Sequence, residues 1–183
     1  MRTITKTFHV HTIDELKGDA LKQALEHVSN RRHQDFVDFA ANEFIKSVHV
    51  FAKRFGFRLT EYSVGFFDPD THIHLENVSY FDYSNDERNR LVKELNDSII
   101  SETNGACSLT GVYTDALIFD YFKDKGGTTY NDLHKDVVLA CKDALKRFVS
   151  TTQDDILDEN ASIQFAKDFE MEFLPTGAIY YED

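Results

Sequence analysis

The sequence predicts an α+β fold, in which a mostly antiparallel sheet of about five strands carries about six helices. Segments in which polar and apolar residues alternate are interspersed with segments in which apolar residues recur every three to four positions. These are the spacings of strands and helices. The chain has 183 residues, 42% of them hydrophobic, and it shows no internal repeat or linker. We therefore expect a single domain over 1–183 with a buried core.

The N-terminal third is expected to form a strand and two helices. Residues 3–11 alternate Thr and His with mostly apolar side chains, which is typical of a half-buried strand. A capping box follows directly and starts a helix over about 12–29. The polar sequence at 30–33 predicts a break, after which a second helix covers about 34–55.

The remainder is expected to contain two hairpins separated by helices. β-branched and aromatic residues on both sides of Asp68-Pro69-Asp70 predict a hairpin of 57–67 with 71–81. A second hairpin is expected at the C-terminal end, where 169–173 and 178–181 flank a Pro-Thr-Gly turn. Helices are predicted over about 85–102, 114–125, 130–148 and 153–166, with a loop or short strand at 103–113.

The chain is acidic, and its charge is unevenly distributed. It carries 20 Lys and Arg against 32 Asp and Glu, a formal net charge of −12. Residues 1–60 hold 10 basic and 7 acidic side chains, whereas 61–183 hold 10 basic and 25 acidic ones, a net of −15. A protein that neutralises phosphates needs the opposite surplus, so direct binding of duplex DNA is not expected. The asymmetry instead predicts a basic partner.

Other sequence features indicate a cytoplasmic protein without cofactors. Cys107 and Cys141 form no CxxC pair, which is typical of free thiols in a reducing compartment. No apolar stretch predicts a signal peptide or a membrane span. Motifs of serine nucleophiles and of phosphate-binding loops are also missing from the sequence. These features favour a protein without catalytic activity.

Two acidic runs supply the candidate contacts with a partner. Both coincide with predicted helix starts, where the macrodipole stabilises negative charge, so local structure accounts for each run alone but not for the total excess. The predicted contact residues are Asp82, Asp86, Glu87, Asp154, Asp155, Asp158 and Glu159. The basic cluster Arg31-Arg32-His33 is either an anion-binding patch or a solvated helix junction.

Two His-x-His pairs supply a candidate metal site. Alternation places both members of each pair on one face of a predicted strand, and imidazoles bind divalent metals. The candidate ligands are His9, His11, His72 and His74, with Glu76 further along the second strand. The alternative is that both pairs face solvent, because the residues that alternate with them are apolar.

Three short stretches resemble a family of small acidic proteins that phages, prophages and conjugative elements of Firmicutes-type bacteria carry. The stretches are 11–16 (HTIDEL), 109–115 (LTGVYTD) and 172–180 (EFLPTGAIY). This family is similar to the anti-CRISPR proteins that inhibit Cas9. The resemblance implies a counter-defence role in the bacterial host cell, and it supplies no catalytic residues.

The leading functional hypothesis is therefore a phage-borne inhibitor that binds Cas9, or its guide-RNA complex, through acidic side chains. Cas9 holds its nucleic acids in a positively charged channel, for which clustered carboxylates would compete. One alternative is a metal-dependent nuclease or hydrolase that uses the paired histidines. Another is an antitoxin-like interaction protein, and a homodimer would cover the edges of the predicted sheet.

Overall fold

The structure is a computed structural model that describes residues 7, 9–67, 70–101 and 116–181, with the backbone alone at 35–38 and 99–101. Its helices are α1 (Gly18–Arg54), α2 (Asn85–Ser101), α3 (Ala116–Lys125), α4 (Leu133–Leu157) and α5 (Glu159–Asp168). Its strands are β1 (Phe57–Ser63) and β2 (His72–Asn77), and two short 3-10 turns are η1 (Ile13–Glu15) and η2 (Tyr80–Asp82).

The prediction of about five strands is wrong. Within the described ranges the sheet has two antiparallel strands, β1 and β2, so the hairpin is confirmed in a shorter form. The C-terminal hairpin is reduced to isolated bridges that join Phe173 to His11 and to Ile179. The end of α5 accounts for this, because the amide of Met171 still donates to the Ala166 carbonyl. Too few residues remain before the turn to form a ladder.

Two other expected strands involve residues that the structure does not describe. The predicted strand 3–11 lies partly outside the described residues, and its described positions form only the bridge at His11. The predicted loop or short strand at 103–113 lies wholly outside them.

The predicted helix break at 30–33 is also wrong, because α1 continues through it. Arg32 is only 8% exposed, and its guanidinium donates to the carbonyl and the carboxylate of Asp155. These partners compensate the buried charge, so Arg32 can lie in the middle of α1 without ending the helix. The predicted boundary between 148 and 153 is wrong in the same way, since α4 runs to Leu157 and α5 begins after Asp158.

The chain divides into two compact units. Unit 1 comprises 1–38 and 154–183, and unit 2 comprises 39–153. The divisions fall within α1 and near the end of α4, so both helices contribute residues to both units. The predicted single domain over 1–183 stays a prediction.

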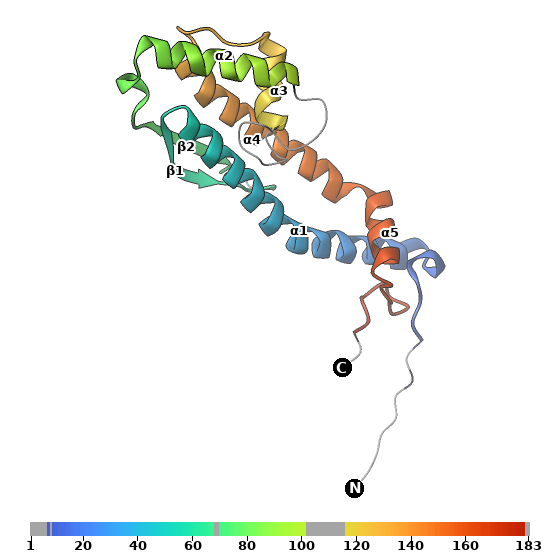
Figure 1. Ribbon diagram of the computed structural model, residues 1–183. Coiled ribbons are helices and arrows are strands. Elements are labelled where there is room, and N and C mark those ends of the chain that lie inside the picture. Colours follow the sequence, from blue (N-terminus) through green and yellow to red (C-terminus); the bar gives the residue numbers. More distant parts are fainter. Residues whose placement is uncertain (1–6, 8, 68–69, 102–115, 182–183) are drawn as a thin grey trace. The chain divides into compact units, whose positions relative to one another are not determined.

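Unit 2 has an aromatic core. Phe44, Phe51 and Phe55 of α1 are fully buried, as are Phe119 and Phe122 of α3. Phe44 stacks on Phe148 of α4 with ring centroids 4.6 Å apart, and Phe51 meets Phe119 edge to face at 6.0 Å. Figure 1 shows the β1–β2 hairpin beside the C-terminal half of α1. The helical spacing of phenylalanines along the sequence thus marks the core-facing side of α1.

Unit 1 has a smaller core, which ties the C-terminal segment to α1. Among the described residues, this core includes Ile13, Leu16, Ala24, Val28, Ala166 and Phe173. The turn at Gly177 packs directly on α1, where a Cβ at that position would lie 2.1 Å from the Ala20 carbonyl oxygen. The turn therefore requires glycine, both for this close approach and for its φ of +91°.

Candidate functional site

The first acidic run surrounds the start of α2, in unit 2. The Glu87 amide donates to the Ser84 hydroxyl at 3.2 Å, and the Ser84 amide donates to the Glu87 carboxylate at 2.8 Å. This capping box confirms the predicted helix start, and its hydrogen bonds lower the pKa of Glu87. Asp82 and Asp86 are exposed and make no ion pair or side-chain hydrogen bond with any described residue.

The second acidic run lies between α4 and α5, in unit 1. Asp158 caps α5 by accepting from the amide of Asn160 at 2.8 Å. Asp155 accepts from the Arg32 guanidinium at 2.9 Å. Asp154 and Glu159 are exposed, and neither has an ion-pair partner within the described part of the chain. Two of these four predicted contact residues therefore have structural partners, and all four are exposed.

Asp154 is the carboxylate that the local structure explains least. It lies in the last turn of α4, where the helix macrodipole makes negative charge unfavourable. That turn contains no basic residue of α4 itself, and the cation that binds it, Arg32 of α1, pairs with Asp155. Glu159 and Asp86, by contrast, lie in the first turns of α5 and α2, where a carboxylate is favourable. Among the described residues, Asp154 therefore makes no contact that stabilises the fold.

The basic cluster at 31–33 is not a free anion site at its centre. Arg32 donates through Nη1 to the Asp155 carbonyl at 3.0 Å and to the Ser162 hydroxyl at 3.2 Å, in addition to its bond with the Asp155 carboxylate. Sequence reasoning missed this arrangement, because 123 positions separate Arg32 from Asp155. No local spacing in the sequence indicates this pairing.

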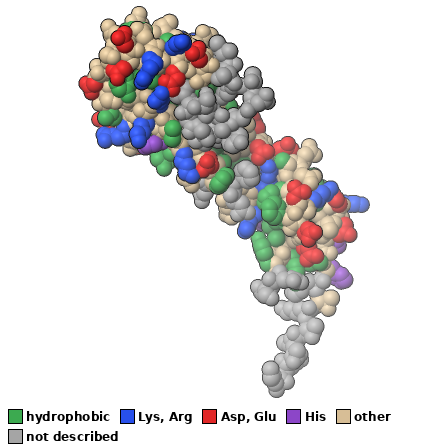
Figure 2. All heavy atoms as spheres, viewed as in Figure 1, with side chains coloured by type: hydrophobic (Ala, Val, Ile, Leu, Met, Phe, Trp, Pro, Cys, Tyr) green, Lys and Arg blue, Asp and Glu red, His purple; other side chains and the backbone are tan. Residues whose placement is uncertain are grey.

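Charges on the visible surface alternate in sign. Figure 2 shows Asp and Glu side chains lying singly or in small groups among Lys and Arg side chains on the face that it draws. A partner that meets this face therefore contacts separate carboxylates rather than a continuous negative surface.

The histidine pairs are distributed over both units. His9 and His11 belong to unit 1, and His72 and His74 belong to unit 2. His11 lies 3.8 Å from Glu15, and His72 lies 3.3 Å from Asp70. Among the residues with described side chains, no three of His, Cys, Asp or Glu are grouped so that they could hold a metal ion. The proposed metal-dependent hydrolase thus has no ligand set in this part of the chain.

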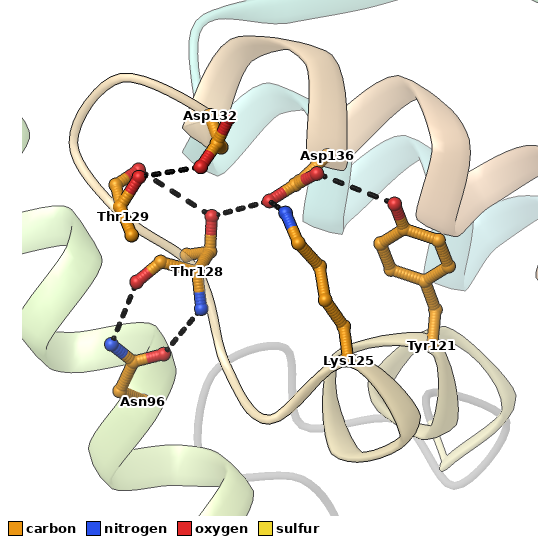
Figure 3. A network of polar contacts seen from close by, with 7 residues as sticks. All are labelled: Asn96, Tyr121, Lys125, Thr128, Thr129, Asp132 and Asp136. Atoms are coloured by element: carbon orange, nitrogen blue, oxygen red, sulfur yellow. Dashed lines mark hydrogen bonds and ion pairs between the residues drawn. The ribbon is translucent and has the colours of Figure 1, made fainter.

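A buried polar network links α2, α3 and α4 within unit 2 (Figure 3). Asp136 is 2% exposed and accepts hydrogen bonds from Lys125, from the Thr128 hydroxyl at 2.6 Å and from Tyr121 at 3.3 Å. Asn96 extends the network, since its side-chain amide exchanges hydrogen bonds with the backbone of Thr128 at 3.1 and 3.2 Å. The bond to Asp136 raises the pKa of Lys125. Tyr121, Lys125, Thr128 and Asn96 each donate at least one hydrogen bond inside the network, which indicates a structural role.

The buried thiol of Cys141 is unsuited to nucleophilic chemistry. Complete burial raises its pKa to about 12, so it stays protonated at neutral pH. Cys107 lies outside the described residues.

The comparisons with known proteins leave the site to be interpreted from its own chemistry. No family model, curated protein or solved structure matches the chain. No helix in the described segments has the length and apolar character needed to cross a bilayer.

Proposed function

We propose that this protein is a binding protein without chemistry of its own, which engages a basic partner through exposed carboxylates. The observation that carries the proposal is Asp154, an exposed acid at the unfavourable end of α4 that has no ion-pair partner among the described residues. Asp82, Asp86 and Glu159 are also exposed. Exposed carboxylates without an ion-pair partner among the described residues remain available for Lys and Arg side chains of a partner.

The proposed partner is Cas9, or its guide-RNA complex, in the cytoplasm of a bacterial host. Cas9 holds its heteroduplex in a positively charged channel and reads the adjacent DNA motif with arginines. Separate exposed acids suit such a surface, because each can pair with one Lys or Arg that would otherwise bind phosphate. The net charge of −12 and the resemblance to mobile-element proteins support this choice of partner.

The test is cleavage of a target DNA by purified Cas9 with its guide RNA in the presence of the protein. We expect inhibition that weakens as salt rises, because exposed charge pairs are screened. The double variant Asp154→Asn/Glu159→Gln should weaken inhibition by about tenfold, since each lost pair contributes up to about 1 kcal/mol.

A matched control removes two other charges from unit 1. Asp19 and Glu26 lie on α1, are exposed and form no ion pair within the described residues. The variant Asp19→Asn/Glu26→Gln should inhibit like the original protein. Full cleavage in the presence of excess protein would contradict the proposal, and so would equal losses of inhibition in the two double variants.

A further inference from the structure

Unit 1 contains a pocket that neither acidic run includes. Its volume is about 370 Å³, and its walls carry the aromatic side chains Phe165, Phe169, Tyr180 and Tyr181. Phe169 and Tyr181 are 67% and 66% exposed, which is unusual for aromatic side chains beside a core. The charged residues of the lining are Glu170 and Glu172, opposed by Arg31 alone. The pocket therefore combines exposed aromatic rings with an excess of carboxylates.

The local fold brings these groups together at the end of α5. Phe165 and Phe169 are one helical turn apart, with ring centroids 4.4 Å from each other. Glu170 has a φ of +48°, an uncommon conformation for a residue with a side chain, and it turns the chain away from the helix. The Tyr180 amide then donates to the Glu172 carbonyl at 2.8 Å, which sets the C-terminal tyrosines beside the segment that follows α5.

This combination selects a planar cation. The faces of aromatic rings are electronegative and attract ammonium and guanidinium groups, most often that of arginine. A guanidinium can stack on a ring and donate to a carboxylate at the same time, which an ammonium does less well. The volume lies near the lower end of the range for ligand pockets, roughly 300–1,000 Å³, and so suits one side chain rather than a large cofactor.

We propose that the pocket between the end of α5 and the C-terminal segment binds an arginine side chain of the basic partner. This inference rests on the proposed function, because it supplies the aromatic anchor that isolated surface carboxylates lack. Arg31 lines the pocket and its neighbour Arg32 holds Asp155, so the pocket and the second acidic run adjoin the same stretch of α1 in unit 1. Arginines anchored by aromatic rings are common centres of binding energy at interfaces.

The test uses N-acetyl-arginine amide as the probe and the full chain as the receptor. Two-dimensional amide NMR spectra should show saturable shifts at residues 165–181, with a dissociation constant in the millimolar range. The citrulline analogue has the same shape without the charge and should bind at least fivefold more weakly. N-acetyl-lysine amide should also bind more weakly than the arginine probe.

Two variants assign the binding to the pocket. Phe169→Leu removes an aromatic face and should weaken arginine binding by about fivefold or more. Phe39→Leu is the matched control, because Phe39 is 70% exposed and belongs to unit 2. It should leave the affinity unchanged. Glu170→Gln/Glu172→Gln should also weaken binding, whereas Glu26→Gln should not.

Several outcomes would overturn the inference. They are the absence of shifts at 165–181, equal affinity for the citrulline or lysine probe, and self-association that perturbs the same signals without any probe. The experiment contains no Cas9, so it separates the two proposals. Arginine binding without inhibition of Cas9 would refute the proposed partner but support the arginine pocket. Inhibition of Cas9 without arginine binding would refute the pocket but support the partner.

Discussion

Asp136 shows how one buried carboxylate organises its surroundings. Three donors from α3 and the turn before α4 converge on it, and the Lys125 ammonium supplies the compensating charge (Figure 3). A buried ion is tolerated when a countercharge and hydrogen bonds replace its lost hydration. The same surroundings also affect Tyr121. Its burial and the neighbouring Asp136 carboxylate raise the pKa of its hydroxyl group.

Truncation of this carboxylate should therefore be costly. We expect Asp136→Ala to lower the free energy of unfolding by about 2–4 kcal/mol, because it leaves buried donors without an acceptor. Urea unfolding followed by circular dichroism measures this as a lower midpoint with an unchanged slope. Asp132→Ala is the control. Asp132 accepts one exposed hydrogen bond from Thr129, so its loss should cost about 1 kcal/mol or less. Equal midpoints for the two variants would contradict a structural role for the network.

The sequence predicts residues well where their partners are local. The capping pair Ser84 and Glu87 follows from a spacing of three residues, and the structure confirms it. The sequence does not predict the pairing of Asp136 with Lys125 or that of Arg32 with Asp155. No local spacing indicates which donor meets which acid. For the same reason the sequence does not indicate that Asp155, a predicted partner contact, also pairs with Arg32.

Two glycines with left-handed backbone separate the effect of conformation from that of packing. Gly177 and Gly126 have φ values of +91° and +80°. A Cβ at Gly177 would meet the backbone of α1, whereas a Cβ at Gly126 would meet nothing within 4 Å. The turn at Gly177 thus fixes the C-terminal segment against α1, while Gly126 only ends α3.

Gly177→Ala should consequently be far more destabilising than Gly126→Ala. We expect a loss of about 3 kcal/mol or more for Gly177→Ala, from strain plus the overlap with the Ala20 carbonyl. Gly126→Ala carries the backbone strain alone and should cost about 1–2 kcal/mol. Urea unfolding of both variants measures the difference. Hydrogen exchange of the Leu174 and Tyr180 amides should also accelerate in Gly177→Ala, because both donate backbone bonds in this turn segment. Similar losses in the two variants would show that packing on α1 contributes little.

At the level of elements, the spacing of apolar residues predicts where the helices lie better than it predicts the residues at which they begin and end. Apolar residues at helical spacing located α2, α3 and both parts of α1. The polar segment at 30–33 predicts a break, and the predicted helices over 130–148 and 153–166 leave a gap between them, although α1 and α4 continue through these positions. Polarity alone does not end a helix when long-range partners bind the polar groups. Alternation at the chain ends predicted strands where the described residues form only isolated bridges, since a ladder also needs partner length.

The net charge of −12 acts on the whole molecule. Like charges repel one another in the compact state, and this repulsion lowers stability at low ionic strength. Local ion pairs offset part of it, such as Arg54 with Glu94 at 2.5 Å and Arg147 with Asp143 at 2.6 Å. Acids that neither pair nor lie at a helix start, such as Asp154, add to the repulsion without a local gain. If the excess serves binding, its removal should improve folding and harm recognition together.

Asp154→Asn tests this opposition between stability and binding. At about 0.01 M salt we expect the variant to gain roughly 0.3–0.5 kcal/mol of unfolding free energy, because the change removes negative charge from the last turn of α4. The gain should shrink at about 0.15 M salt, where the Debye length falls to about 8 Å. Urea midpoints at both salt concentrations measure it. Glu159→Gln is the opposite control, since Glu159 lies in the first turn of α5 and its loss should reduce stability. Weaker partner binding by both variants, with stability changes of opposite sign, would separate recognition from folding. A loss of stability in Asp154→Asn would instead show that the acid belongs to the fold.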